Sequence, residues 1–148
     1  MDVELSGMEE NLKQMESRVH PRLDRSPIVL AVDDEEDFLE LTELFLGGAG
    51  IHVLKARSAT EALWHALRNP PDLIFLDLML PHVDGFQVLR ALKAEPETRD
   101  IPVFACTAAD FGDARRVLSA GFDALFPKPV NWTRLREILR TLFSRSEG

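Results

Sequence analysis

Five polar side chains follow short apolar runs of this sequence, close to the point where each run stops. They are three carboxylates, one hydroxyl and one amine: Asp33, Asp34, Asp77, Thr107 and Lys128. If they gathered in one place, three negative charges and one positive charge would be untenable without a further cation. Ligands that offer only oxygen, with no cysteine or paired histidines, suit Mg²⁺, which keeps its remaining positions for water and phosphate. The residue types therefore predict a magnesium site.

The hydrophobic pattern predicts the elements that would bring these side chains together. Short apolar runs bounded by turn residues predict five strands: Ile28–Val32, His52–Lys55, Leu73–Leu76, Val103–Cys106 and Ala124–Phe126. Helical patterns alternate with them: Asp37–Leu46, Thr60–Arg68, Gly85–Ala94, Asp113–Ala120 and Trp132–Phe143. This alternation predicts an α/β fold, a doubly wound parallel sheet with helices on both faces. Ligands of such sheets bind at the carboxyl ends of the strands, so the polar side chains are expected at one edge.

Local signals predict where several of the helices begin and end. Ser58 and Glu61 fit a capping box at the start of the second helix. Gly47, Gly48 and Gly50 are expected to end the first helix, and Asp84 to precede the third as a loop and cap residue. Acidic residues after Asp34 fit the first turn of a helix, where the helix dipole favours negative charge.

Composition and charge bound the class of protein. A chain of 148 residues, 45% of them hydrophobic, is long enough for one globular domain with its own core. The net charge of −8 argues against direct nucleic-acid binding. No apolar run approaches the roughly 18 residues of a membrane span, and the acidic start is unlike a signal peptide. We therefore expect a cytoplasmic protein without a membrane partner, and a single cysteine, Cys106, that is part of the core.

The ordered motifs resemble the receiver domain of two-component response regulators. They are Asp33-Asp34, Asp77 followed by LMLPHVDG, Thr107-Ala108 and Lys128-Pro129, each at a predicted strand end. The resemblance covers residues 27–144, with residues 1–26 as a helical or disordered extension and residues 145–148 as a tail. It implies a five-stranded, flavodoxin-like sheet in the order 2-1-3-4-5. Because the chain ends soon after the last predicted helix, we expect a stand-alone receiver or a piece of a longer protein.

The resemblance also implies the roles of the site residues. Asp77 would be the phosphoacceptor, and Asp34, Asp77 and the backbone carbonyl of Met79 would hold Mg²⁺, with Asp33 acting mainly through water. The Lys128 ammonium would share the phosphoryl oxygens with the metal.

The Thr107 hydroxyl and the Ala108 amide would take another phosphoryl oxygen. A carboxylate that attacks phosphorus forms an acyl phosphate, a step that needs positioning and charge neutralisation more than acid–base work.

The implied function is phosphorelay signalling. A histidine kinase or phosphotransfer protein would donate the phosphoryl group, and phosphorylation would change the binding of a downstream protein target. Such a module catalyses the transfer of one phosphoryl group onto its own aspartate. Whether it should be called an enzyme is therefore left open. An aspartate-nucleophile phosphatase and a non-phosphorylated adaptor are the alternatives, and Asp33-Asp34 could also be a simple helix cap. The phosphatase pattern usually carries a second acid two residues after the nucleophile, where this chain has Met79.

One position departs from the family pattern and changes the expected switch. Three residues before the lysine, where an aromatic side chain usually reports activation, this chain has Leu125. We therefore expect activation to be carried by the Thr107 hydroxyl and the loop Ala108–Gly112, with Phe111 changing exposure. The Lys128–Pro129 bond is expected to be cis, and neither tryptophan is expected near the site.

Apolar residues near the amino terminus follow a heptad spacing. They are Leu5, Met8, Leu12, Met15 and Val19, separated by 3, 4, 3 and 4 positions. Two heptads are too few to decide between a helix and disorder. If this spacing forms the apolar seam of a coiled coil, residues 5–19 would pair with a second chain as a dimer or pack on the receiver.

Overall fold

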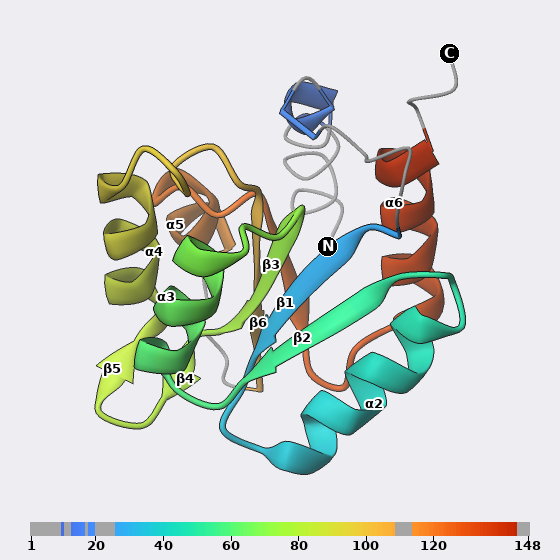
Figure 1. Cartoon of the computed structure of the whole chain (residues 1–148), viewed down its shortest axis with the longest axis horizontal. Coiled ribbons are helices and arrows are strands. Elements are labelled where there is room, and N and C mark those ends of the chain that lie inside the picture. Colours follow the sequence, from blue (N-terminus) through green and yellow to red (C-terminus); the bar gives the residue numbers. More distant parts are fainter. Residues whose placement is uncertain (1–9, 11–12, 17, 20–25, 109–113, 145–148) are drawn as a thin grey trace.

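Within the described residues, five parallel strands form the central sheet, in the order β2-β1-β3-β6-β7 (Figure 1). The computed structural model describes residues 10, 13–16, 18–19, 26–108 and 114–144. The strands are β1 (Ile28–Val32), β2 (His52–Ala56), β3 (Leu73–Asp77), β6 (Val103–Thr107) and β7 (Ala124–Pro127). The predicted doubly wound fold and its strand order are confirmed, since β6 and β7 are the fourth and fifth strands of this sheet.

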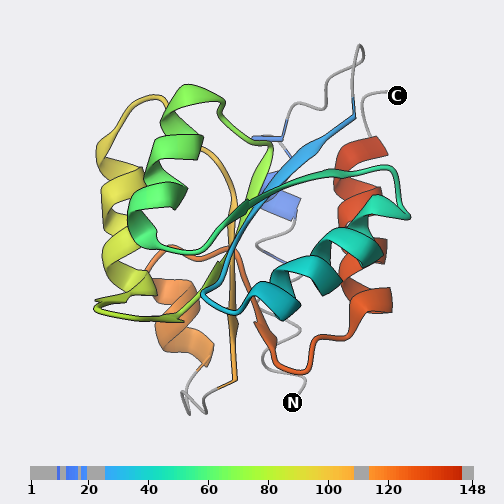
Figure 2. The same ribbon diagram turned by 60° about the horizontal axis from the view of Figure 1, so that its bottom comes forward.

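Helices cover both faces of this sheet (Figures 1 and 2). One layer contains α3 (Ala59–Arg68), α4 (Gly85–Ala94) and α5 (Ala114–Ser119), and the other contains α2 (Glu36–Gly47) and α6 (Trp132–Ser144). Every predicted strand and helix is present, with ends that differ from the prediction by no more than one residue.

Side chains of each strand alternate between two hydrophobic cores, because successive strand residues point to opposite faces. On β3, Leu73 and Phe75 pack in the core on the side of α2 and α6, whereas Ile74 and Leu76 pack on the side of α3, α4 and α5. All five residues of β1, β3 and β6 are buried, as expected for strands covered on both faces. Cys106 is buried in the first of these cores, as predicted.

The caps differ in one respect from the prediction. Ser58 accepts a hydrogen bond from the backbone N–H of Glu61, but the Glu61 carboxylate accepts from Arg57 rather than from Ser58. The predicted capping box is therefore only half formed, since the carboxylate reaches past the cap to the preceding N–H. A complete box stands at Asp84, whose side chain and backbone both exchange hydrogen bonds with Gln87.

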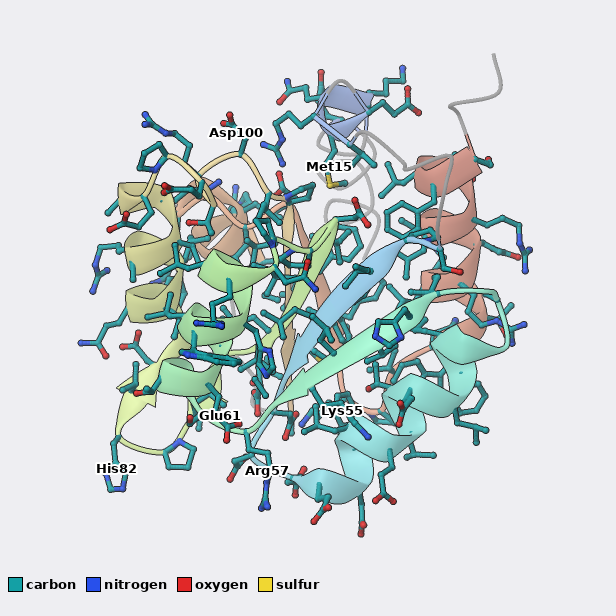
Figure 3. The ribbon with its side chains drawn as sticks, in the orientation of Figure 1. Met15, Lys55, Arg57, Glu61, His82 and Asp100 are labelled. Carbon is teal, nitrogen blue, oxygen red and sulfur yellow. The ribbon has the colours of Figure 1, made fainter. Side chains whose placement is uncertain are left out.

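A short hairpin that the sequence did not predict follows the third strand. It consists of the antiparallel two-residue strands β4 (Met79–Leu80) and β5 (Val83–Asp84). Two residues are too few to show a hydrophobic periodicity, so the sequence pattern could not predict these strands. His82, which Figure 3 labels at the tip, has a φ of 67°, in the left-handed region that turns require and that histidine tolerates better than most residues.

Two aspartates hold the amino ends of the strands. Asp72 accepts a hydrogen bond of 2.7 Å from the backbone N–H of Ile28, and Asp123 accepts one of 2.9 Å from Val103. Asp123 also forms an ion pair of 2.8 Å with Arg18, from the segment before the first strand. These side chains satisfy donors at the edge of the sheet opposite to the predicted site.

The segment before β1 contributes to the hydrophobic core. Met15 and Val19 are 0% and 1% exposed and belong to the core on the side of α2 and α6. Figure 3 shows Met15 near the amino ends of the central strands. Both side chains are buried within this chain, so they are not available to a second copy. Leu5, Met8 and Leu12 lie outside the described residues, and the division of the chain at residue 26 stays a prediction.

Among the described residues, no helix has both the length and the apolar composition needed to cross a lipid bilayer.

The burial of Met15 predicts a measurable contribution to stability. Met15→Ala should lower the free energy of unfolding by about 2–4 kcal/mol, because it removes a fully buried side chain and leaves a cavity. Leu44→Ala is the matched control, because Leu44 is 69% exposed and its loss should change stability by less than about 0.5 kcal/mol. Urea unfolding followed by circular dichroism measures both, and equal effects of the two variants would contradict the placement of Met15.

Candidate functional site

The carboxyl ends of the strands bring the predicted polar residues to one edge of the sheet. Asp33 follows β1, Asp77 and Thr107 end β3 and β6, and Lys128 follows β7. Asp33, Asp77 and Thr107 are buried, with 1%, 5% and 2% of their surface exposed. In Figure 3 this edge lies at the bottom, where Arg57 is labelled at the end of β2. Parallel strand direction is the reason that residues so far apart in sequence converge here.

Three carboxylates of this edge form a cluster that could hold a metal ion. One oxygen from each of Asp33, Asp34 and Asp77 lies within 4.8 Å of the others. Asp34 is half-buried, whereas the other two are buried. The donor set contains only oxygen, which fits Mg²⁺ better than metals that prefer nitrogen or sulfur.

Lys128 supplies positive charge to this cluster. Its ammonium nitrogen lies 2.7 Å from Asp33 Oδ2, 3.6 Å from Glu35 Oε1 and 3.7 Å from Asp77 Oδ2. Burial alone would lower the pKa of Lys128, but the hydrogen bond to Asp33 and the charges of Asp77 and Asp33 outweigh it and raise the pKa. Lys128 is therefore held as a cation in the site.

The backbone of Lys128 is anchored to the neighbouring strand. Its N–H donates a hydrogen bond of 2.9 Å to the carbonyl oxygen of Thr107. The Lys128–Pro129 bond is cis, which confirms the prediction.

The carboxyl group of Asp77 is costly to ionise in the metal-free protein. Burial raises its pKa above the ordinary value, and the charges of Asp33 and Asp34 act in the same direction. The N–H of Met79, which donates a hydrogen bond of 3.0 Å to Asp77 Oδ1, and the charge of Lys128 only partly oppose this rise. A cation beside Asp77 would remove much of the cost.

Asp33 is not a simple helix cap. The N-cap of α2 is Glu35, which makes no side-chain cap hydrogen bond. Asp33 Oδ1 accepts from the N–H of Glu35 at 2.8 Å, while Oδ2 accepts from Lys128. One carboxylate thus shapes the turn into α2 and also binds the lysine. The adjacent Asp34 has its backbone oxygen near the Arg57 guanidinium, at 3.3 Å.

The remaining predicted residues lie around this cluster or outside the described chain. Met79 is 57% exposed in β4, and Ala108 is exposed directly after β6. Leu125 is half-buried and packs in the core on the side of α3, α4 and α5. The predicted loop beyond Ala108, including Phe111, lies outside the described residues, and the roles of all these positions stay predictions.

Gly85 allows α4 to begin directly against the strand that ends in Asp77. A Cβ at this position would lie 2.8 Å from the Leu78 side chain and 2.9 Å from Leu78 Cα, closer than real contacts. The Gly85 N–H donates a hydrogen bond of 3.0 Å to the carbonyl oxygen of Leu78. The glycine in the LMLPHVDG motif is therefore required by close backbone approach.

Two aromatic residues near the lysine were missed by sequence reasoning. The Lys128 ammonium lies 4.1 Å from the centroid of the Phe38 ring, and Phe38 packs on Trp132 at 5.7 Å. Trp132, which the sequence analysis places away from the site, reaches it only through Phe38, because α6 packs beside α2. Phe38 lies one turn after Asp34 and Trp132 four residues after Lys128, a proximity in sequence that could have indicated them.

Comparison with known proteins agrees with this fold. Residues 29–140 match the family model of the response regulator receiver domain. The polar-differentiation response regulator DivK of Brucella ovis is 37% identical over 114 residues, which cover 76% of this chain and 93% of that protein.

Solved structures of similar fold are also receiver domains of response regulators. The signal receiver domain of a DNA-binding response regulator from Colwellia psychrerythraea has a TM-score of 0.73 at 28% identity, over 79% of this chain and 98% of that one. The receiver domain of the Francisella response regulator 1452 has a TM-score of 0.73 at 27% identity, over 82% and 99% of the two chains.

The chain belongs to the response regulator receiver domain family. As a member of it, this protein is a module of phosphorylation-dependent signalling.

The raised pKa of Asp77 predicts a pH-dependent effect on stability. A carboxyl group with a raised pKa in the folded state stabilises the fold at low pH and loses that contribution as pH rises through the raised value. Without divalent cations at neutral pH, Asp77→Asn should therefore be more stable than the parent by about 1 kcal/mol, because it removes a buried charge. The difference should shrink at acid pH.

Urea unfolding in the presence of a chelator, at neutral and at acid pH, measures this difference. Asp100→Asn is the control, because Asp100 is exposed and its replacement should leave stability unchanged at both pH values. A less stable Asp77→Asn protein at neutral pH would show that the Asp77 charge stabilises the metal-free fold.

Proposed function

We propose that this receiver accepts a phosphoryl group on Asp77 from a phosphohistidine of a histidine kinase or phosphotransfer protein. The observation that carries the proposal is the position of Asp77. Its carboxylate ends the middle strand of the sheet, within 4.8 Å of two other acidic oxygens and 3.7 Å from the Lys128 ammonium. A nucleophilic carboxylate beside one cationic side chain and a further cation site is the arrangement that phosphoryl transfer requires.

The residues of the site have distinct roles in the proposed transfer. One oxygen of Asp77 forms a bond to phosphorus while the phosphorus–nitrogen bond of phosphohistidine breaks, and the electron pair of that bond stays on the imidazole nitrogen. Lys128 offsets the negative charge of the phosphoryl oxygens, and the Thr107 hydroxyl and Ala108 N–H are donors to the same group. Because these groups position the phosphoryl group and neutralise its negative charge, the transfer needs no general base.

The acidic residues would hold Mg²⁺. Asp34, Asp77 and the carbonyl oxygen of Met79 would be ligands, and Asp33 would act mainly through water. When bound, Mg²⁺ would supply positive charge against the phosphoryl oxygens. The hydrogen bond from Lys128 to Asp33 supports the indirect role of Asp33, because this carboxylate already has a cationic partner.

We further propose that phosphorylation changes the binding of a downstream protein. The alternatives remain a phosphatase that turns over and an adaptor whose site is not phosphorylated. A lasting acyl phosphate after mixing with a small phosphodonor and Mg²⁺ would support the receiver role. Continuous release of phosphate would favour the phosphatase, and no reaction would favour the adaptor.

Replacement of Asp77 should abolish phosphorylation. Asp77→Asn keeps the size of the side chain but removes the nucleophile, so intact-mass spectrometry after incubation with acetyl phosphate and Mg²⁺ should show no added phosphoryl group. The parent protein should gain a single group that is stable in acid and labile in base. Asp100→Asn should behave like the parent, and a phosphoryl group on another carboxylate of Asp77→Asn would refute the assignment.

Replacement of Asp34 should weaken magnesium binding. Asp34→Ala removes one proposed ligand, so the dissociation constant measured by titration calorimetry should rise by about tenfold or more. Asp72→Ala is the control, because Asp72 lies at the opposite edge of the sheet and should leave the constant unchanged. Equal constants for Asp34→Ala and the parent would exclude Asp34 as a ligand.

A further inference from the structure

The face of the Phe38 ring lies against the ammonium group of Lys128. The distance from Nζ to the ring centroid is 4.1 Å, within the range in which the negative ring face attracts a cation. The Lys128 side chain is only 14% exposed, so water screens this attraction less than at an open surface. Phe38 is therefore an uncharged partner of a cation whose other neighbours are carboxylates.

Neighbouring aromatic rings fix the orientation of Phe38. The ring stacks near Phe75 of β3, with a centroid distance of 6.4 Å and an interplanar angle of 25°. Trp132, the first residue of α6, also contacts the ring, at a centroid distance of 5.7 Å and an interplanar angle of 38°. Trp132 in turn stacks on Phe45 of α2 at 5.1 Å and 6°. These contacts hold the Phe38 ring between the sheet and the first turn of α6.

The carboxylates alone do not fix where the ammonium lies. Its nitrogen is 2.7 Å from Asp33 and 3.7 Å from Asp77, so a small displacement would exchange the nearer partner. A ring face attracts the ammonium without offering it an acceptor in one direction. Phe38 can therefore hold the lysine inside the site while it moves between the two aspartates.

We propose that Phe38 is a positioning residue for Lys128, and that Trp132 senses through Phe38 where the ammonium lies. The inference rests on the proposed phosphorylation of Asp77, which would draw the ammonium toward the new phosphoryl oxygens. The ammonium would then move away from the Phe38 ring, and the contact of that ring with Trp132 would carry the change to the surface formed by α2 and α6.

The proposed route from Lys128 through Phe38 to Trp132 differs from transmission of the phosphorylation signal through the last strand, β7. Leu125 of β7 has no ring and packs in the opposite core, on the side of α3, α4 and α5. Phe38, Trp132 and Phe45 all lie on the side of α2 and α6. The aromatic contacts of Lys128 therefore lead to a different face of the molecule.

The experiment combines a rate with a spectroscopic signal. The parent is Trp64→Phe, which leaves Trp132 as the only tryptophan. In this background, Phe38→Leu removes the ring face and Phe38→Tyr retains it. Phe45→Leu is the matched control, because it removes a ring that stacks on Trp132, whereas the ring against the Lys128 ammonium is that of Phe38. Circular dichroism and urea unfolding establish that each variant is folded under the conditions used.

Phosphorylation by acetyl phosphate with Mg²⁺ should slow about three- to tenfold in Phe38→Leu, the loss expected for one cation–π contact. Phe38→Tyr and Phe45→Leu should keep the rate of the parent. Addition of beryllofluoride, a phosphoryl mimic, should change the Trp132 emission in the parent, Phe38→Tyr and Phe45→Leu, and should change it by less than half as much in Phe38→Leu.

Three results would overturn the inference. They are equal rates for Phe38→Leu and Phe45→Leu, a Trp132 emission that stays constant while Asp77 of the parent is phosphorylated, and a full emission response in Phe38→Leu. A parent protein that gains no phosphoryl group at all would instead overturn the proposed function on which the inference rests.

Discussion

The site depends on one partly buried lysine that lies among carboxylates. Without the Lys128 ammonium, the carboxylates of Asp33 and Asp77 would face each other in a region that water barely reaches, and ionising both would be expensive. The ammonium lowers that cost but does not remove it, because the pKa of Asp77 is still raised. The remaining negative charge is what makes the edge of the sheet suited to a divalent cation and to a phosphoryl group held by it.

The rest of the fold serves to hold this cluster together. Strands buried on both faces give Asp33 and Asp77 rigid supports, because the residues that precede them, Val32 and Leu76, are packed in the core on the side of α3, α4 and α5. Close approach at Gly85 brings α4 against the end of β3, and the backbone hydrogen bond from Lys128 to Thr107 ties the last two strands together at the site. At the opposite edge, Asp72 and Asp123 bind backbone donors at the strand starts. Met15 and Val19 extend the core beyond the part of the chain that carries the motifs.

An aromatic ring adds an uncharged partner to the surroundings of the Lys128 ammonium. Glu35, the N-cap of α2, lies near Lys128, and Phe38 follows three residues later with its ring face toward the same ammonium. A cation between a ring and carboxylates is attracted from both sides, yet only the carboxylates impose a direction. In the proposed coupling, the position of the ammonium would act on the surface of α2 and α6 through Phe38, whereas the core position of Leu125 lacks an aromatic group.

The sequence by itself determined the five strands of the central sheet, the helices, their order along the chain and the edge at which Asp33, Asp77 and Lys128 meet. This succeeded because strand and helix periodicities are local, and because parallel strands send their carboxyl ends to one side. Only the tertiary structure decided that Phe38 lies under Lys128, that Trp132 packs on Phe38, and that Met15 is part of the core. Those contacts depend on how helices cross and which surfaces they leave to be filled. The sequence alone does not show whether the apolar side chains of a heptad, or a lone aromatic residue, face solvent, a partner or the core of their own chain.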